Sequence, residues 1–327
     1  MMKHFFRLVA VLLMLAVVAC SFALAQEAAE PRLSLTTGLP TEKEYTPYMI
    51  NLDNAGGARP QKGLAAADII YEAEIENGGA TRYTLLFNDY IPEIAEPVRS
   101  ARMLHADIAL DWNATFIHYG GQQLDGTNVY DYMSEKGVVH IDGISVGQPY
   151  FHRDSNRAAP HNVICELSDI VQSEKYGRVA EEKSPLKFDA ESYTKIGEPV
   201  KTFEIVYKKG YAPAYSYNEE DGLYYRYYNR EQQLDGETGE AVTCANVIIM
   251  YADYTYYNWE GDRPVAELTG KNYCKYFIDG NYFEGYWTRR SVDNATYFRD
   301  VNGDEVIFKP GKTCIQIIRE DKEITMN

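Results

Sequence analysis

The chain has 327 residues, with 48 acidic and 32 basic side chains and a formal net charge of −16. A chain of this length usually holds about two domains, and a content of 45% apolar residues is enough for packed cores. The strong negative charge repels nucleic acids and anionic lipid surfaces, so it argues against either as a general partner.

Residues 1–25 have the form of a bacterial export signal. Lys3 and Arg7 give a positive start, and residues 8–19 form an uninterrupted apolar run. The run is shorter than the roughly 18 to 20 residues that a membrane-spanning helix needs, which favours a cleaved signal. Its removal takes away two bases and no acid. The mature chain then has 30 bases against 48 acids, a net charge of −18.

Two cleavage sites compete at the end of this signal. The stretch VVAC at 17–20 resembles a lipobox, in which Cys20 is lipidated and becomes the first residue. The stretch ALA at 23–25 suits ordinary signal peptidase, with cleavage after Ala25. We expect lipidation at Cys20, with simple secretion as the alternative. Both predict an extracytoplasmic protein, and the lipidated form contacts the membrane only through its anchor.

The mature chain begins with a polar stretch at 26–44 that lacks periodicity, which we interpret as a tether. Residues 69–76 then alternate between apolar and mostly acidic side chains, which predicts a half-buried strand with a solvated or ion-paired acidic face. Residues 82–88 alternate again after the turn sequence NGG at 77–79. The two segments therefore predict a β-hairpin.

A helix is predicted over residues 100–112, because apolar residues recur at 101, 104, 108 and 112. A strand at 114–119 and a second helix at 163–176 follow. The pattern over 45–180 indicates an N-terminal α+β domain, a layered sheet with packed helices.

Residues 181–200 are charged and carry two prolines, so we expect a linker there. Beyond it, residues 201–327 show short strands separated by Asp-Gly and Asn-Gly pairs, the strongest hairpin signals. The C-terminal domain is therefore predicted to be mostly β, and the fold class of the chain is α+β. Adjacent tyrosines at 224–225 and 227–228 must place one ring on each face of a strand, which hints at an exposed aromatic surface.

Four cysteines lie beyond Cys20, at positions 165, 244, 274 and 314. None forms a C-x-x-C pair, so a zinc site or a thioredoxin-like motif has no support. The four could form two disulfides in an exported protein, or remain buried thiols. The histidines are scattered, and the sequence predicts no metal site and no cofactor.

The strongest candidate site is the stretch Arg99-Ser100-Ala101-Arg102 at the predicted start of the first helix, where Ser100 is a candidate N-cap. The free N–H groups of a helix N-terminus already make that end positive, so two arginines there need a compensating anion. The anion could be a bound phosphate or carboxylate. Other loops could add further candidate residues to this site: Arg82, Arg153, Arg157, His161 and Asn162.

The alternative is that the arginines pair with carboxylates of the chain itself. Several acids are available for this internal pairing: Asp53, Asp68, Glu72, Glu74, Glu76 and Glu96. If a ligand binds instead, the bacterial envelope offers polyprenyl phosphates, teichoic-acid-like polymers and peptidoglycan carboxylates.

Recognisable catalytic motifs are absent from the sequence. Ser100 lacks a G-x-S-x-G setting, and the acids at 72, 74 and 76 share one face of a strand rather than forming an acid and base pair. We therefore expect a non-catalytic binding protein for an anionic envelope ligand or an envelope protein partner. The alternatives are an envelope phosphotransferase or hydrolase that uses the same arginines, and a purely structural interaction protein.

Eleven short motifs of this chain together resemble the YerB-like family of bacterial lipoproteins, which consists of two successive domains of unknown function. The N-terminal motifs are NLDN at 51–54, ARPQKGL at 58–64, ADIIYE at 67–72, TR at 81–82, PVRSAR at 97–102, HYGG at 118–121 and APHN at 159–162. The C-terminal motifs are NVII at 246–249, LTG at 268–270, GYW at 285–287 and PGKT at 310–313. The resemblance implies a three-layer α/β first domain and an envelope lipoprotein, and it implies no substrate.

Overall fold

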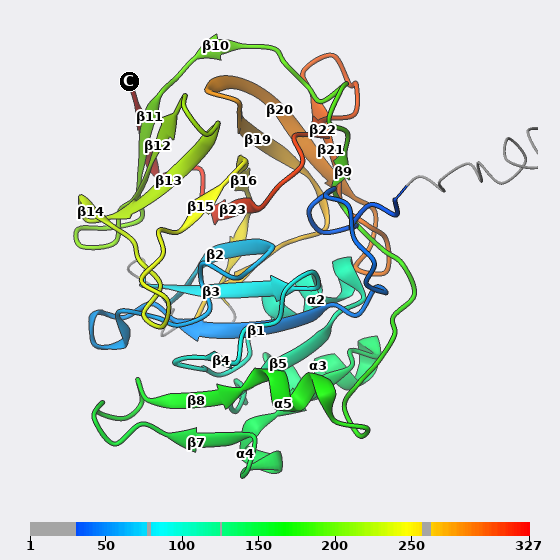
Figure 1. Ribbon diagram of the computed structural model, residues 1–327, viewed down its shortest axis with the longest axis vertical. Helices are drawn as coiled ribbons and strands as arrows, with labels where there is room; N and C mark the ends of the chain where they lie inside the picture. Colours follow the sequence, from blue (N-terminus) through cyan, green and yellow to red (C-terminus); the bar gives the residue numbers. More distant parts are fainter. Residues whose placement is uncertain (1–30, 77–79, 125, 257–262) are drawn as a thin grey trace, which may run out of the picture.

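The computed structural model describes residues 31–76, 80–124, 126–256 and 263–327. Within these residues, an eleven-stranded mixed sheet runs through both halves of the chain, in the order β10-β20-β19-β16-β23-β2-β3-β1-β5-β6 with β21 against β20 (Figure 1). Its strands are β1 (Tyr48–Asp53), β2 (Ile69–Glu76), β3 (Ala80–Phe87), β5 (Thr115–His118), β6 (His140–Asp142), β10 (Glu198–Pro199), β16 (Asn246–Tyr251), β19 (Gly270–Ile278), β20 (Asn281–Arg289), β21 (Tyr297–Asp300) and β23 (Thr313–Ile318).

The two halves meet where β23, near the C-terminus, pairs in parallel with β2, with Ile69 opposite Thr313 and Ala73 opposite Ile317. The predicted hairpin is confirmed, because β2 and β3 pair in an antiparallel register. Its predicted turn at 77–79 lies outside the described residues. The prediction of a half-buried β2 is wrong, because Glu72 and Glu74 are fully buried between the sheets.

A six-stranded sheet covers one face of the large sheet. Phe203 on β11 stacks on Phe277 of β19, with ring centroids 3.6 Å apart. Arg226 on β13 reaches across to Glu72 and forms a buried ion pair, which explains the burial of this acid. The strands of the smaller sheet are β11 (Thr202–Val206), β12 (Pro213–Asn218), β13 (Leu223–Tyr228), β14 (Glu231–Gln232), β15 (Thr243–Cys244) and β24 (Glu323–Met326).

Helices α2 (Met103–Trp112) and α3 (Val129–Lys136) cover the opposite face of the large sheet. Leu104 and Trp112 of α2 belong to the same apolar core as Met49 and Tyr71 of the sheet. The predicted helix begins later than expected, at residue 103 instead of 100. The reason is that Ala101 is held in a β-bridge with Gly121, which keeps the backbone before residue 102 extended.

The second predicted helix, over 163–176, is only partly correct. Residues 163–166 form strand β8, and helix α5 (Leu167–Gln172) follows. The remaining helical elements are the short η1 (Gly56–Ala58) and α4 (Gly143–Val146). Strands β4 (Ile94–Ala95) and β7 (Phe151–Arg153) flank β8 (Val163–Glu166) in a three-stranded sheet. Two further strand pairs are β9 (Lys187–Phe188) with β22 (Ile307–Phe308) and β17 (Tyr254–Thr255) with β18 (Val265–Ala266). The prediction of an α+β fold is confirmed, and strands dominate it.

The segments expected to act as tether and linker pack against this core in the described part of the chain. Thr36 is buried and donates a hydrogen bond to Asp68 Oδ2 at 2.9 Å. Leu186 is buried in the helix-side core, and β9 and β10 pair with strands of the C-terminal half. Residues 1–25 and 26–30, which include the predicted signal and the start of the tether, lie outside the described residues.

The four described cysteines are all buried and free, so the structure selects the buried-thiol alternative over two disulfides. Of each adjacent tyrosine pair on β13, one ring is buried and the other is partly exposed, as the alternation predicts. No helix in the described part of the chain is long and apolar enough to cross a membrane.

Candidate functional site

The candidate site lies at the edge of the large sheet where β1, β5 and β6 end. These three strands are parallel, so Asp53, His118 and Asp142 finish at the same edge. Strand β3 runs in the opposite direction and begins there, with Arg82 directly opposite Asp53. Ligands of α/β proteins commonly bind outside the carboxyl ends of parallel strands.

The loop that carries Arg99 and Arg102 is bound between two of these strand ends. The Arg99 N–H donates to the Asn51 carbonyl at 3.0 Å, and the Tyr119 N–H donates to the Arg99 carbonyl at 3.1 Å. The Ala101 N–H donates to the Gly120 carbonyl at 2.9 Å. These hydrogen bonds hold the loop across the edge, so Arg99 and Arg102 flank the start of α2.

Arg82 is 2% exposed, and its Nη1 donates to the Ser100 carbonyl at 2.5 Å. Burial, followed by repulsion from Arg102 and Arg99, lowers the pKa of Arg82 well below its usual value. Asp53 and Glu76 attract its charge, but Arg82 forms no ion pair within 4.0 Å with a carboxylate of the described residues. The charged form of Arg82 is therefore destabilised in the absence of a bound anion.

Arg102 is 6% exposed and occupies the N-cap position of α2, in place of the predicted Ser100. Its Nη1 donates to the Ala101 carbonyl at 3.0 Å, whereas its buried Nε has no partner among the described residues. Burial lowers the pKa of Arg102 to about 10, with further repulsion from Arg263 and Arg99 and attraction from Glu76. This end of α2 combines a buried guanidinium with the positive helix terminus.

Arg99 differs from these two arginines because the chain supplies its counter-charge. Its Nε lies 3.1 Å from Asp53 Oδ2, and its Nη1 donates to the Pro160 carbonyl at 3.3 Å. The same Asp53 oxygen lies 2.6 Å from His161 Nδ1. Internal pairing, the alternative considered from the sequence, therefore applies to Arg99 and His161.

Arg153 and Asn162 belong to the neighbouring loop. Arg153 Nη1 donates to Asn162 Oδ1 at 2.7 Å, and its guanidinium lies over the Tyr119 ring at 5.4 Å. Asn162 donates in turn to the carbonyls of Asp154 and Arg157, each at 3.1 Å. These contacts hold the loop next to the arginines, and no described contact joins either residue to Arg82 or Arg102.

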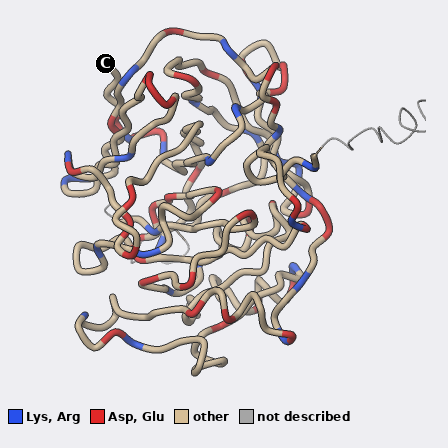
Figure 2. The backbone as a smooth tube through the Cα atoms, viewed as in Figure 1, with Lys and Arg blue, Asp and Glu red and all other residues tan. Residues whose placement is uncertain are grey.

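Most of the acids considered as internal partners are used elsewhere. Glu72 pairs with Arg226, and Glu74 lies 3.0 Å from Lys322. Glu96 lies 3.7 Å from Lys62 and 3.6 Å from Arg157, and Asp68 accepts hydrogen bonds from Thr36 and from two backbone N–H groups. Acidic and basic positions are interspersed along the described part of the chain (Figure 2), yet two buried arginines there form no ion pair with a carboxylate within 4.0 Å.

His105 is a residue of this site that the sequence interpretation missed. It is fully buried, and its Nδ1 accepts from the Arg102 N–H at 3.0 Å and from Asn51 Nδ2 at 2.7 Å. The proton of the neutral ring is therefore on Nε2, which is buried and has no described partner. Burial and the nearby arginines hold the pKa of His105 well below its usual value. The three-residue spacing from the N-cap to His105 could have indicated this role.

A second group of side chains lies at the ends of β5 and β6. His118 Nδ1 donates to the Gly120 carbonyl at 2.8 Å, and its Nε2 lies 3.0 Å from His140 Nδ1. Burial lowers the pKa of His118 to about 4. Tyr130 donates to Asp142 Oδ2 at 2.7 Å. Among the described residues, no three or more histidine, cysteine, aspartate or glutamate side chains are grouped so that they could hold a metal ion.

Two cavities lie away from the arginines. One, of about 790 Å³, lies on β19 and β20, and another, of about 360 Å³, lies beside residues 33–38 and 186–192. At the arginine site, Arg99 and His161 are partly exposed, at 20% and 28% of their side-chain surface.

Comparison with known proteins identifies relatives over most of the chain. The chain is 29% identical over 291 residues to a protein named "Putative lipoprotein YerB" from Bacillus subtilis (strain 168), and the match covers 86% of this chain and 85% of that protein. The crystal structure of the YerB protein from Bacillus subtilis matches with a TM-score of 0.77 and 25% identity, and covers 90% of this chain and 99% of the crystallised chain. The sequence also matches the N-terminal domain model of the protein of unknown function DUF3048 over residues 36–180 and its C-terminal domain model over residues 203–315. The chain therefore belongs to the DUF3048 family of two-domain, YerB-like proteins.

Proposed function

We propose that this protein is a non-catalytic lipoprotein of the bacterial envelope, anchored through Cys20, whose N-terminal half binds a phosphate or carboxylate group of an envelope ligand. The name of the Bacillus subtilis relative supports the lipid anchor, as does the VVAC stretch at 17–20. The ligand-binding part of the proposal depends on the arginine site.

The observation that carries the binding proposal is the pair of buried arginines without a carboxylate partner in the described structure. A buried charge that is unpaired costs several kcal/mol, by the order of magnitude found for ions taken out of water. An anion bound between Arg82 and Arg102 would remove that cost. A ligand that binds the folded protein and not the unfolded chain also stabilises the fold.

The site offers donors that suit a tetrahedral or planar anion. Arginine forks bind phosphate and carboxylate through paired hydrogen bonds, and Arg102 Nε and His105 Nε2 are buried donors that the described residues leave unused. The start of α2 adds its N-terminal partial charge. Asp53 opposes binding, because its carboxylate lies beside Arg99.

The test is the thermal stability of the chain from Gln26, measured with increasing inorganic phosphate and, separately, acetate. We expect the melting temperature of the unchanged protein to rise with the anion and that of Arg102→Met to stay constant. Asp53→Asn removes the competing carboxylate, so its response should occur at lower anion concentration. Arg290→Met, at an exposed arginine, is the matched control and should respond like the unchanged protein.

Opposite effects of Arg102→Met and Asp53→Asn cannot come from a general folding defect. A constant melting temperature of the unchanged protein in both anions contradicts the binding proposal, and so does an equal response of Arg102→Met and the control. The anchor is tested separately by labelling cells with a palmitate analogue, because Cys20→Ser should abolish incorporation of the label and release the protein from the membrane.

A further inference from the structure

One described cavity lies on the C-terminal half, away from the arginine site. It has a volume of about 790 Å³, within the range of small-molecule binding pockets. It opens on the face of β19 and β20 where the six-stranded sheet ends, because Phe277 further along β19 is covered by Phe203. The cavity thus lies on the large sheet beside the part that the six-stranded sheet covers, and Tyr251, Val301 and Glu320 also line it.

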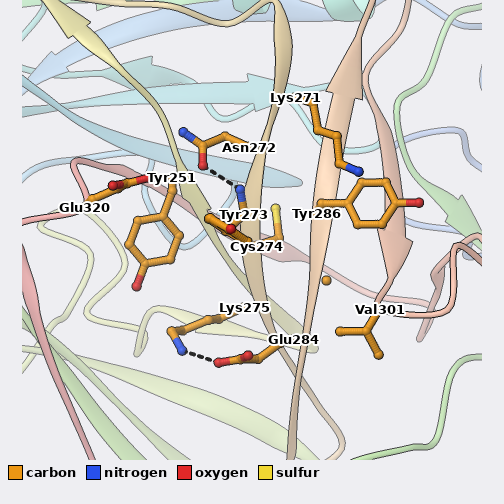
Figure 3. A pocket seen from close by; sticks show the side chains of 11 residues that line it. Tyr251, Lys271, Asn272, Tyr273, Cys274, Lys275, Glu284, Tyr286, Val301 and Glu320 are labelled. Atoms are coloured by element: carbon orange, nitrogen blue, oxygen red, sulfur yellow. Dashed lines mark hydrogen bonds and ion pairs between the residues drawn. The ribbon is translucent and has the colours of Figure 1, made fainter.

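Tyrosine rings dominate this cavity. Tyr273 on β19 is 68% exposed, and its cross-strand partner is Tyr286 on β20. Figure 3 shows Tyr273 between Tyr251 on one side and Tyr286 on the other. Tyrosines on paired strands are rigid, so little conformational entropy is lost when a ligand covers them.

The charged side chains of the cavity balance one another. Lys275 Nζ lies 2.6 Å from Glu284 Oε1, and Lys271 Nζ lies 3.7 Å from the centre of the Tyr286 ring. Glu320 is exposed and forms no ion pair with the described residues, so two lysines face two glutamates. This balance favours an uncharged ligand, unlike the cationic arginine site.

The remaining polar groups suit hydroxyl and amide groups of a ligand. Asn272 Oδ1 accepts from the Tyr273 N–H at 2.7 Å, which leaves its Nδ2 free to donate in the described structure. Glu320 offers an acceptor at the rim. The aliphatic lining is limited to Val301, so the tyrosine rings supply most of the apolar side-chain surface of the cavity.

We propose that this cavity is a binding site for an uncharged oligosaccharide, such as a segment of an envelope glycan strand. The C–H groups on one face of a sugar ring carry partial positive charge, and they contact the negative face of an aromatic ring. Tyr273, which is largely exposed, supplies such a face, whereas one face of Tyr286 is already covered by Lys271. Asn272 and Glu320 supply a donor and an acceptor for the ring substituents. The site is independent of the arginine site and of its proposed function.

The test is isothermal titration calorimetry of the chain from Gln26 with tetramers of β-1,4-linked N-acetylglucosamine and of β-1,4-linked glucose. We expect one of the two to bind. Tyr273→Ala should weaken that binding by about tenfold or more, the size of one lost ring contact. Tyr297→Ala, at a tyrosine that is 46% exposed on the adjacent β21 and does not line the cavity, is the matched control and should bind normally.

Because Tyr273 is largely exposed, its replacement should leave the melting temperature unchanged, so a loss of binding reports on the cavity itself. Absence of binding of both tetramers to the unchanged protein at millimolar concentrations overturns the proposal. Equal affinity of Tyr273→Ala and Tyr297→Ala also overturns it. Arg102→Met should bind the sugar normally, which separates this site from the proposed anion site.

Discussion

Replacement of Arg102 by methionine should stabilise the protein when no anion is bound. Methionine keeps much of the side-chain length and removes a charge that is 6% exposed and unpaired within the described structure. Exchange of buried ionic groups for apolar side chains of similar volume is neutral or stabilising by about 1–4 kcal/mol. The exchange removes the repulsion of Arg102 by Arg82, Arg263 and Arg99, and it also removes the attraction between Arg102 and Glu76.

The lost contact is small by comparison. Arg102 Nη1 donates to the Ala101 carbonyl at 3.0 Å, and a hydrogen bond of this kind contributes about 1 kcal/mol. The carbonyl keeps a second donor, because the Gln122 N–H lies 3.2 Å from it. Arg82 is a poorer choice for this experiment, since its removal takes away the described donor to the Ser100 carbonyl.

The balance predicts a gain in the free energy of unfolding of about 1–2 kcal/mol, which raises the melting temperature by roughly 2–4 °C per kcal/mol for domains of this size. The assay is scanning calorimetry at neutral pH in a buffer without phosphate or carboxylate. Arg290→Met, at an exposed site, should change stability by no more than about 0.5 kcal/mol. A melting temperature of Arg102→Met that falls below that of the control would refute the reasoning, because it would mean that Arg102 has a stabilising partner.

Three further predictions concern other parts of the fold. Burial, with repulsion from the nearby Asp89, raises the pKa of Asp68 to about 7 in the folded chain, whereas the unfolded chain releases this proton near pH 4. The protonated carboxyl therefore favours the folded state at low pH, and this contribution to stability is lost as the pH rises from about 4 to 7. Asp68→Asn keeps an oxygen that accepts the same hydrogen bonds. Urea denaturation should show this variant to be more stable than the unchanged protein by on the order of 1 kcal/mol at pH 8, and no more stable at pH 4. An equal difference in stability at both pH values contradicts this prediction. Glu72→Ala should lower the free energy of unfolding by about 3–5 kcal/mol, because it leaves Arg226 buried without its ion-pair partner. The control Glu219→Ala, which removes an exposed pair with Lys201, should lower it by less than about 1 kcal/mol. Similar losses of stability in the two variants would contradict the importance of the buried pair. A thiol reagent should label the chain from Gln26 only after denaturation, because its four cysteines are buried and free, and fewer than four labels per unfolded chain would contradict the free-thiol assignment.

Much of the local structure could be predicted from short-range patterns. The alternation over residues 69–76 and 82–88 predicted the hairpin of β2 and β3, and the spacing of apolar residues identified the body of α2. The start of α2 could not be predicted in the same way, because the bridge from Ala101 to Gly121 depends on where β5 ends in space.

Part of the candidate site could be predicted from the sequence. The proximity of Arg99, Ser100 and Arg102 is a matter of chain neighbours, and the resemblance to a two-domain family indicated that the stretch recurs as a motif. The sequence could not predict which of the arginines has a carboxylate partner. Asp53 pairs with Arg99 and leaves Arg82 without a described carboxylate, because the register of β1 and β3 and the path of the loop decide which groups lie within a few ångströms.

The sequence by itself determined the α+β class, the acidic charge, and the export signal that we predict at the start of the chain. Only the tertiary structure decided that β23 pairs with β2 and joins the two halves in one sheet, and that this pairing and the smaller sheet bury Glu72 and Glu74. The physical reason is that side-chain periodicity reports on the immediate neighbours of a residue, whereas burial and charge pairing depend on segments more than two hundred residues apart, such as residues 69–73 and 313–317.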